Sequence, residues 1–224
     1  MIPRGMVALD LDGVLIRDES SWGIYHKAMG TTGGQRDINM RDFFSGKIDY
    51  GTWAMRDAAL WKGRSIEPVR RALPQINLTE GALDLVEGLR STGVLPVIIS
   101  TGISEIANRA GDLLGIDTVV SNEVEVLDGK VTGRVRIHCG FGEKGSLVRE
   151  MAERASIPIG RCAAVGDAEN DLPMFRAVPL SIAFNPRSEE VARAATVVVR
   201  DRTLHRVREI LVEHLGQVKR CIRS

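Results

Sequence analysis

The sequence predicts an α/β fold with a mainly parallel β-sheet that helices cover on both faces. Six short runs of apolar and β-branched residues have the length of buried strands. Segments with the apolar spacing of helices lie between most of them, and this alternation is typical of parallel sheets with helical crossovers. The six runs are 7–11, 95–99, 118–120, 162–165, 180–183 and 196–199.

Three segments between these runs have the pattern of amphipathic helices. In the first of them, Leu85, Val86 and Leu89 fall on one face of a helix. The other two repeat the pattern, so each helix can cover the sheet with its apolar face. The segments are 82–89, 106–114 and 144–155.

Residues 123–137 depart from this alternation. Asp128-Gly129 lies between two runs of alternating polar and apolar residues, 124–127 and 130–132. Asp-Gly is typical of the two-residue turn of a β-hairpin, so we expect a hairpin here.

Residues 16–77 contain no run typical of a buried strand. Amphipathic helical patterns occur around 49–61 and 66–73. We therefore expect a small helical insertion after the first strand. It would rise from the carboxyl edge of the sheet, where ligand sites of α/β proteins lie.

Composition and charge exclude several classes of protein. The 224 residues suffice for one domain with a smaller inserted one. The net charge of +1 argues against a nucleic-acid or membrane-surface protein. No apolar run reaches the roughly 18 residues that span a bilayer, and the first residues lack the pattern of a signal peptide.

The cysteines and histidines do not form a metal-binding pattern. Cys139, Cys162 and Cys221 are widely spaced and form no C-x-x-C, so neither a zinc site nor a disulfide framework is expected. The four histidines also lack metal-ligand spacing. Reduced thiols are typical of a cytoplasmic protein, which is the expected location.

Polar side chains that could carry chemistry follow the carboxyl ends of predicted strands or open a helix. Because these strand ends meet at one edge of a parallel sheet, residues far apart in sequence can form one site. The set comprises Asp10, Asp12, Ser100, Lys144, Asp167, Asn170 and Asp171.

Four members of this set are aspartates, and their mutual repulsion requires a cation. A pair of like charges in contact costs on the order of 4 kcal/mol at an effective dielectric near 20. Oxygen ligands without cysteine or histidine favour Mg²⁺ over zinc. Magnesium commonly joins one or two carboxylates to a substrate phosphate, so we expect a Mg²⁺ site that receives a phosphate group.

The same residues can transfer a phosphoryl group. Mg²⁺ and Lys144 would offset the phosphate charge and allow the Asp10 carboxylate to attack phosphorus. Asp12 is placed to protonate the leaving alcohol and then to activate the water that hydrolyses the Asp10 phosphate. Donors to the phosphate oxygens would be the Ser100 hydroxyl and the backbone N–H groups of Thr101 and Gly102.

This order of motifs resembles the haloacid dehalogenase superfamily of phosphohydrolases over nearly the whole chain. Segment 10–15 resembles motif I, segment 98–102 motif II, Lys144 motif III and segment 165–171 motif IV. The resemblance implies that Asp10 is the nucleophile and Asp12 the acid and base. It also implies that Asp10, the backbone carbonyl of Asp12 and Asp167 hold Mg²⁺, that Asp171 supports them, and that Asn170 helps to bind the substrate.

The resemblance also implies a domain division. A Rossmann-like core would comprise residues 1–15 and 78–224, with the hairpin as a flap. Residues 16–77 would be a helical cap of the C1 type.

Within the superfamily, the chain is most similar to phosphoserine phosphatases, in the hairpin region 121–133 and in segment 170–175. That similarity implies a place in serine biosynthesis. It also implies that Arg56 grips the substrate carboxylate and Glu19 its ammonium group. Trp53 and Trp61 are expected in the core of the cap, although they could instead line a different leaving-group pocket.

Three positions depart from the usual phosphoserine phosphatase pattern without removing a catalytic group. Gly13-Val14 replaces Ser-Thr, Thr101 replaces the first glycine of Ser-Gly-Gly, and Ala168 replaces the glycine after Asp167. These departures weaken the case for phosphoserine itself.

The expected function is hydrolysis of a small phosphomonoester, with phosphoserine as the first candidate. Other phosphorylated amino alcohols, phosphosugar acids, transfer of phosphate to an alcohol, and a non-catalytic sensor remain alternatives. The expected partner is a small phosphorylated metabolite, with no nucleic acid or membrane, and the chain would be a monomer or a homodimer.

Overall fold

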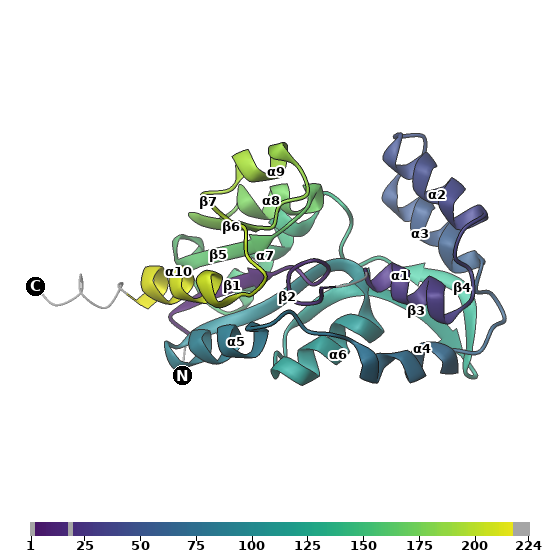
Figure 1. Ribbon diagram of the computed structural model, residues 1–224, viewed down its shortest axis with the longest axis horizontal. Helices are drawn as coiled ribbons and strands as arrows, with labels where there is room; N and C mark the ends of the chain where they lie inside the picture. The colour runs from purple at the N-terminus through teal and green to yellow at the C-terminus, as the bar shows by residue number, and fades with distance from the viewer. Residues whose placement is uncertain (1–2, 18–19, 217–224) are drawn as a thin grey trace, which may run out of the picture.

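The computed structural model describes residues 3–17 and 20–216. Within these ranges, seven strands form one sheet in the order β4-β3-β2-β1-β5-β6-β7 (Figure 1). All neighbouring strands are parallel except β3 and β4. The strands are β1 Gly5–Leu9, β2 Val94–Ile103, β3 Val119–Leu127, β4 Lys130–Arg136, β5 Cys162–Gly166, β6 Leu180–Phe184 and β7 Val197–Val199.

Strand β1 lies at the centre of the sheet, and every one of its residues is buried. Ala8 lies opposite Val97 of β2 and Ala164 of β5. Because β1 and β5 are parallel neighbours, the residues that follow them, Asp10 and Asp167, emerge at the same edge. This arrangement confirms the predicted α/β fold class.

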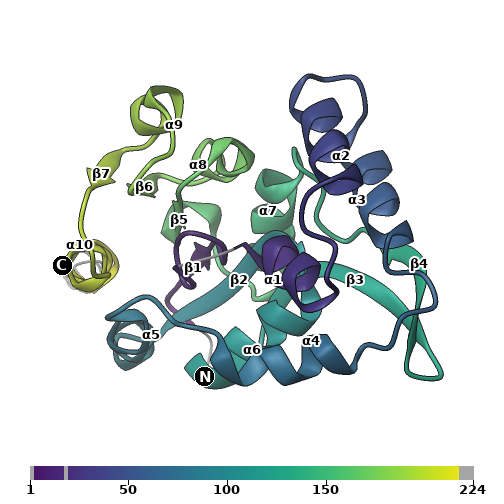
Figure 2. The ribbon, with the colours of Figure 1, turned by 45° about the vertical axis from the view of Figure 1, so that its right-hand side comes forward.

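Helices cover both faces of the sheet, as alternation along β1 requires. Val7 and Leu9 belong to the core beneath α5, α6 and α10, whereas Met6 and Ala8 belong to the core beneath α7, α8 and α9. Figure 2 shows these two groups of helices on opposite sides of the sheet. The helices are α5 Ala82–Ser91, α6 Ser104–Leu114, α7 Lys144–Arg154, α8 Leu172–Phe175, α9 Glu189–Ala194 and α10 His205–Gly216.

The segment between β1 and β2 is helical and lies over the carboxyl edge of the sheet. Ser20 and Asp49 cap the first and third of its helices, accepting hydrogen bonds from Gly23 N at 3.1 Å and Thr52 N at 2.7 Å. Helices α2 and α3 stand side by side, away from the main sheet (Figures 1 and 2). The elements are α1 Ser21–Ala28, α2 Gln35–Phe44, α3 Tyr50–Ala59, α4 Glu67–Ala72 and the short 3₁₀ helix η1 Leu73–Gln75.

The hairpin predicted for residues 123–137 is formed by β3 and β4. Its turn residues Asp128 and Gly129 have φ values of 49° and 74°, as a two-residue hairpin turn of type I′ requires. The run 118–120 was expected as a separate strand, but it continues into β3. Helix α3 packs against β4, so the hairpin supports the helical segment.

Strand β2 differs from the prediction at its carboxyl end. We expected the strand to end at Ser100, but it continues to Ile103. The pairing with β3 shifts register between Ile99 and Ile103, which is the mark of a β-bulge or similar irregularity. Ser100 to Gly102 therefore lie on a distorted strand rather than in a free loop.

None of the helices in the described part of the chain is both long enough and apolar enough to cross a membrane.

Candidate active site

A buried lysine joins two of the predicted aspartates. Lys144 opens α7 and is 0% exposed, and its Nζ lies 2.6 Å from Oδ1 of both Asp10 and Asp171. Although burial alone would lower it, these two carboxylates raise the pKa of Lys144 well above its usual value. Lys144 is therefore a permanent cation beneath the site.

Asp10 is held firmly at the end of β1. Its Oδ1 accepts a hydrogen bond from Leu11 N at 2.8 Å in addition to the contact with Lys144. Burial, together with the charge of Asp171, raises its pKa well above the usual range even though Lys144 opposes the shift. Burial and the charge of Asp171 therefore destabilise the ionised form of Asp10, and additional positive charge nearby would stabilise it.

Asp167 and Asp171 come from the turn that follows β5. Asp171 Oδ2 accepts from the backbone N–H groups of Asp167 at 2.7 Å and Ala168 at 3.0 Å, which fixes the turn. Asp167 Oδ2 lies 2.5 Å from Nε of Arg187. Burial raises the pKa of Asp167 to about 6, and Arg187 opposes this shift only in part.

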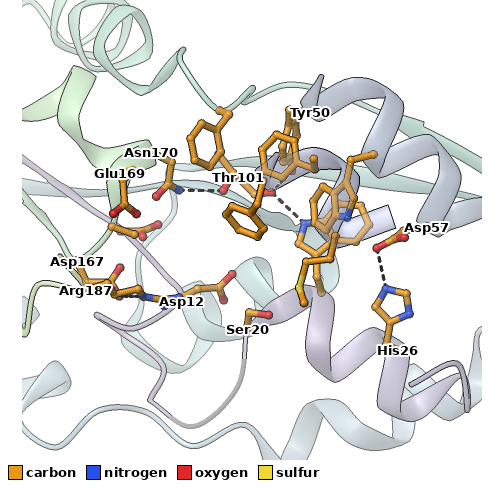
Figure 3. A pocket seen from close by; sticks show the side chains of 18 of the residues that line it. Asp12, Ser20, His26, Tyr50, Asp57, Thr101, Asp167, Glu169, Asn170 and Arg187 are labelled. Atoms are coloured by element: carbon orange, nitrogen blue, oxygen red, sulfur yellow. Dashed lines mark hydrogen bonds and ion pairs between the residues drawn. The ribbon is translucent and has the colours of Figure 1, made fainter. Parts of the chain in front are cut away.

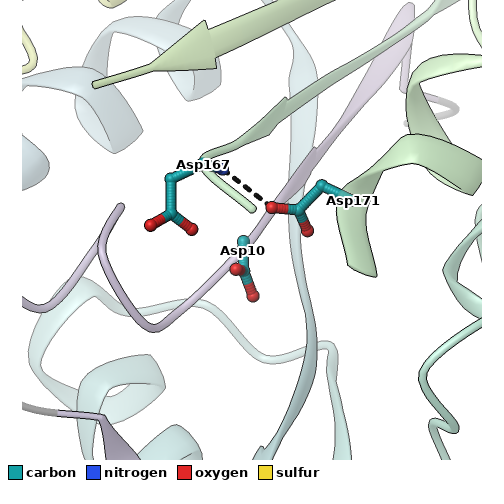
Figure 4. A group of neighbouring side chains, drawn as sticks. All are labelled: Asp10, Asp167 and Asp171. Atoms are coloured by element: carbon teal, nitrogen blue, oxygen red, sulfur yellow. Dashed lines mark hydrogen bonds between the residues drawn. The ribbon is translucent and has the colours of Figure 1, made fainter. Parts of the chain in front are cut away.

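These carboxylates fit a divalent metal ion. Oxygen atoms of Asp10, Asp167 and Asp171 all lie within 4.8 Å of one another (Figure 4). Asp167 Oδ1 is buried and has no hydrogen-bond partner, so one ligand position is free. An oxygen-only donor set suits Mg²⁺.

Asp12 connects the sheet to the helical segment. Its Oδ1 accepts from Ser21 N at 2.9 Å and its Oδ2 from Ser21 Oγ at 2.8 Å. Ser21 begins α1 and also accepts from Ile103 N at 3.2 Å. Burial raises the pKa of Asp12, while the Ser21 contacts oppose the rise, so the helical segment orients this carboxyl group.

The predicted phosphate donors on β2 are partly engaged within the protein. Gly102 N donates to Ser100 Oγ at 2.9 Å, and Asn170 Nδ2 donates to Thr101 Oγ1 at 3.0 Å. The Thr101 carbonyl accepts from Trp22 Nε1 at 3.2 Å and from the Tyr50 hydroxyl. Thr101 thus links the predicted catalytic edge to α1 and α3.

A cavity of about 370 Å³ lies between the carboxylates and the helical segment. Asp10, Asp12 and Asp167 line one end of it, and aromatic side chains line the other. Figure 3 shows Asp12, Asp167 and Arg187 on one side and His26 with Asp57 on the other. A small organic phosphate can therefore reach Asp10 from a largely apolar pocket.

Comparison with known proteins agrees with this geometry. The sequence model of the haloacid dehalogenase-like hydrolase family matches residues 7–176. The chain belongs to this family. The resemblance inferred from the motifs, including the likeness to phosphoserine phosphatases, is confirmed.

Two curated relatives illustrate the likeness to phosphoserine phosphatases. The chain is 29% identical to the phosphoserine phosphatase of Methanocaldococcus jannaschii, and the match covers 81% of the chain and 85% of that protein. The chain is also 29% identical to the phosphoserine phosphatase of Streptomyces coelicolor over 86% of its own residues. That match covers only 47% of the Streptomyces coelicolor protein, so the chain spans about half of its length.

Solved structures agree in fold. A phosphoserine phosphatase in complex with substrate has a TM-score of 0.81 and 25% identity, covering 92% of this chain and 97% of that one. A phospho-aspartyl intermediate analogue of phosphoserine phosphatase has a TM-score of 0.80 and 26% identity, over 92% and 98% of the two chains.

The structure brings together the four family motifs but not Arg56, which was predicted to bind the leaving group. Arg56 does not line the cavity. Its Nη1 lies 3.4 Å from Asp42 Oδ2, and its side chain is 46% exposed. Glu19 lies outside the described residues.

The two tryptophans divide between the two roles considered for them. Trp61 is 0% exposed and its Nε1 donates to Thr31 Oγ1 at 2.9 Å, so it belongs to the core. Trp53 lines the cavity.

Sequence reasoning missed several residues of this site, among them Arg187, His26 and Asp57. Arg187 follows β6 at the same edge of the sheet, so the strand-end rule that identified Asp10 also applies to it. His26 and Asp57 lie on helices of the insertion, and no strand end marks them.

Substitution of Gly102 by alanine is expected to destabilise the protein at the candidate active site. A Cβ there would overlap Ser21 Oγ and lie 3.0 Å from Ser100 Oγ and 3.1 Å from Asp12 Oδ2. We expect a loss of about 1–3 kcal/mol in the free energy of unfolding, measured by denaturant titration. Gly160→Ala is the control because a Cβ there meets no atom within 4 Å, and equal stability of the two variants would contradict the prediction.

Proposed function

We propose that this chain is a Mg²⁺-dependent phosphatase that hydrolyses a small phosphomonoester through an aspartyl-phosphate on Asp10. One observation carries the proposal: Asp10 lines the cavity while its Oδ1 is held by Lys144 and the Leu11 N–H. The carboxylate is thereby aimed at a bound phosphate and balanced by a buried cation.

Hydrolysis proceeds in two half-reactions, and Asp12 takes part in both. In the first, Asp10 attacks phosphorus and the bond to the leaving oxygen breaks, while Asp12 gives its proton to that oxygen. In the second, Asp12 takes a proton from a water molecule, which attacks the aspartyl-phosphate and releases inorganic phosphate. The raised pKa of Asp12 favours the protonated form that the first step needs.

Asp10, the backbone carbonyl of Asp12 and Asp167 would hold Mg²⁺, with Asp171 fixing the turn that carries Asp167. When bound, the ion supplies positive charge that offsets the phosphate charge. Lys144 contributes to the same balance from below.

The domain division supports a closed reaction site. We propose that residues 16–77 act as a cap on a core of residues 1–15 and 78–224. The Asp12–Ser21 contacts and the donors to the Thr101 carbonyl tie the cap to the core around the cavity. Such closure would exclude bulk water from the aspartyl-phosphate.

The names of the relatives make phosphoserine or a similar small phosphorylated metabolite the first substrates to test. Support for phosphoserine comes from those names rather than from Arg56, because Arg56 contacts Asp42 outside the cavity. The role of Glu19 stays a proposal.

Release of inorganic phosphate from a panel of small phosphomonoesters tests the function. Turnover is expected with Mg²⁺ and is expected to be lost on chelation and recovered on return of the metal. Folded protein with Mg²⁺ that releases phosphate from no ester would contradict the proposal.

A further inference from the structure

Aromatic rings form the wall of the cavity opposite the carboxylates. Trp22 on α1 and Trp53 on α3 have ring centroids 4.6 Å apart, and Phe43 on α2 stacks on Trp53 at 5.5 Å. Tyr50 extends the wall, with its ring centroid 5.4 Å from that of Trp53. Phe44, Met40 and Phe141 also line it.

This wall begins directly beside the phosphate end of the cavity. Trp22 Nε1 and the Tyr50 hydroxyl both donate to the carbonyl of Thr101, whose side chain is held by Asn170. The polar edges of both rings are thus fixed on β2 next to the catalytic residues. A group esterified to a phosphate at Asp10 can therefore reach these rings.

A buried carboxylate lies at this wall. Asp57 is 1% exposed and lines the cavity, where it accepts from Asn39 Nδ2 at 2.7 Å and contacts His26 Nε2 at 3.0 Å. The faces of aromatic rings also carry negative potential. A carboxylate on the leaving group would be repelled here, whereas a cation would be attracted.

The arginines that line the cavity already have carboxylate partners. Within the described residues, Arg36 and Arg187 line it, and each has a carboxylate partner: Asp37 at 3.2 Å and Asp167 at 2.5 Å. Among the described residues that line the cavity, Asp57 is the carboxylate at the aromatic end, whereas Asp10, Asp12 and Asp167 lie at the other end.

We propose that the leaving alcohol carries an alkylammonium group and no carboxylate. The inference rests on the proposed phosphatase function and specifies its substrate class. The ammonium group lies against the rings of Trp22, Tyr50 and Trp53, and the Asp57 carboxylate supplies the compensating charge. A cavity of about 370 Å³ has the size of a site for a small molecule.

The test separates charge from shape. The kcat/KM for phosphocholine is compared with that for 3,3-dimethylbutyl phosphate, which has the same shape but a carbon in place of the charged nitrogen. Phosphocholine is expected to be preferred by about tenfold or more, as cation–π contacts in a desolvated site require. Phosphoserine is expected to be a poorer substrate than phosphocholine.

Two variants test whether Trp53 and Asp57 produce the preference for phosphocholine. Trp53→Leu and Asp57→Asn are each expected to remove most of the preference for phosphocholine over its neutral isostere. Ile38→Ala is the matched control, since Ile38 lies on α2, is 43% exposed and does not line the cavity. Thermal unfolding of each variant verifies that the fold is retained.

Binding of choline tests the inference without measuring turnover. Choline, but not 3,3-dimethylbutanol, is expected to change the tryptophan fluorescence of the wild type, and the change is expected to shrink in Trp53→Leu. Equal kcat/KM for the two isosteric esters, or a preference for phosphoserine, would overturn the inference and leave the phosphatase function intact. Absence of phosphate release from every ester would instead overturn the function and this inference with it.

Discussion

Asp10→Asn is expected to lower phosphate release by on the order of 10⁴-fold or more, because an amide cannot act as the nucleophile. The substitution keeps the shape of the side chain, and the contacts of Asp10 Oδ1 with Lys144 and Leu11 N can be retained by the amide oxygen. The fold should therefore survive. Steady-state phosphate release from the best ester of the panel measures the loss.

Two controls make this result specific. Asp84→Asn removes an exposed carboxylate outside the cavity and is expected to leave turnover unchanged. In the Asp10→Asn protein, the rise in melting temperature on addition of Mg²⁺ should also diminish, because one metal ligand has lost its charge. Substantial turnover by a folded Asp10→Asn protein would show that another group attacks phosphorus.

Lys144→Met is expected to reduce both stability and activity. Removal of the ammonium group leaves Asp10 and Asp171 buried without their shared cation, and breaking a buried ion pair in this way costs about 3–5 kcal/mol. Loss of a group that stabilises charge in the transition state typically lowers kcat by about 10²–10³-fold. Denaturant titration and phosphate release measure the two effects separately.

Lys47→Met provides the matched control. Lys47 Nζ lies 3.2 Å from Asp42 Oδ1, and its side chain is 67% exposed. Surface pairs of this kind contribute at most about 1 kcal/mol, so little change is expected. If Lys144→Met were as stable as Lys47→Met, the buried charges would be balanced in another way.

The motifs of the core could be predicted because each is encoded within a few consecutive residues. An apolar run followed by Asp10 and Asp12, or by Asp167 and Asp171, specifies a buried strand and the acidic turn after it. Parallel pairing then places all such turns at one edge. The hairpin turn at Asp128-Gly129 was predictable for the same local reason.

The aromatic cavity could not be predicted in this way. Trp22, Phe43 and Trp53 lie on three different helices, and helical periodicity alone does not distinguish a residue that fills a core from one that lines a pocket. Trp53 and Trp61 show this difference, since they are close in sequence and yet only Trp53 lines the cavity.

The sequence by itself determined the α/β class, the family and the acidic catalytic edge, because these follow from local periodicity and from strand ends that a parallel sheet aligns. Only the tertiary structure decided what faces the leaving group. It turned Arg56 towards Asp42 and placed Asp57 against the cavity, although the two are neighbours in the chain. Successive residues of a helix point about 100° apart, so the docking of α3 on the hairpin, and not the residue types, selects which side chain the substrate meets.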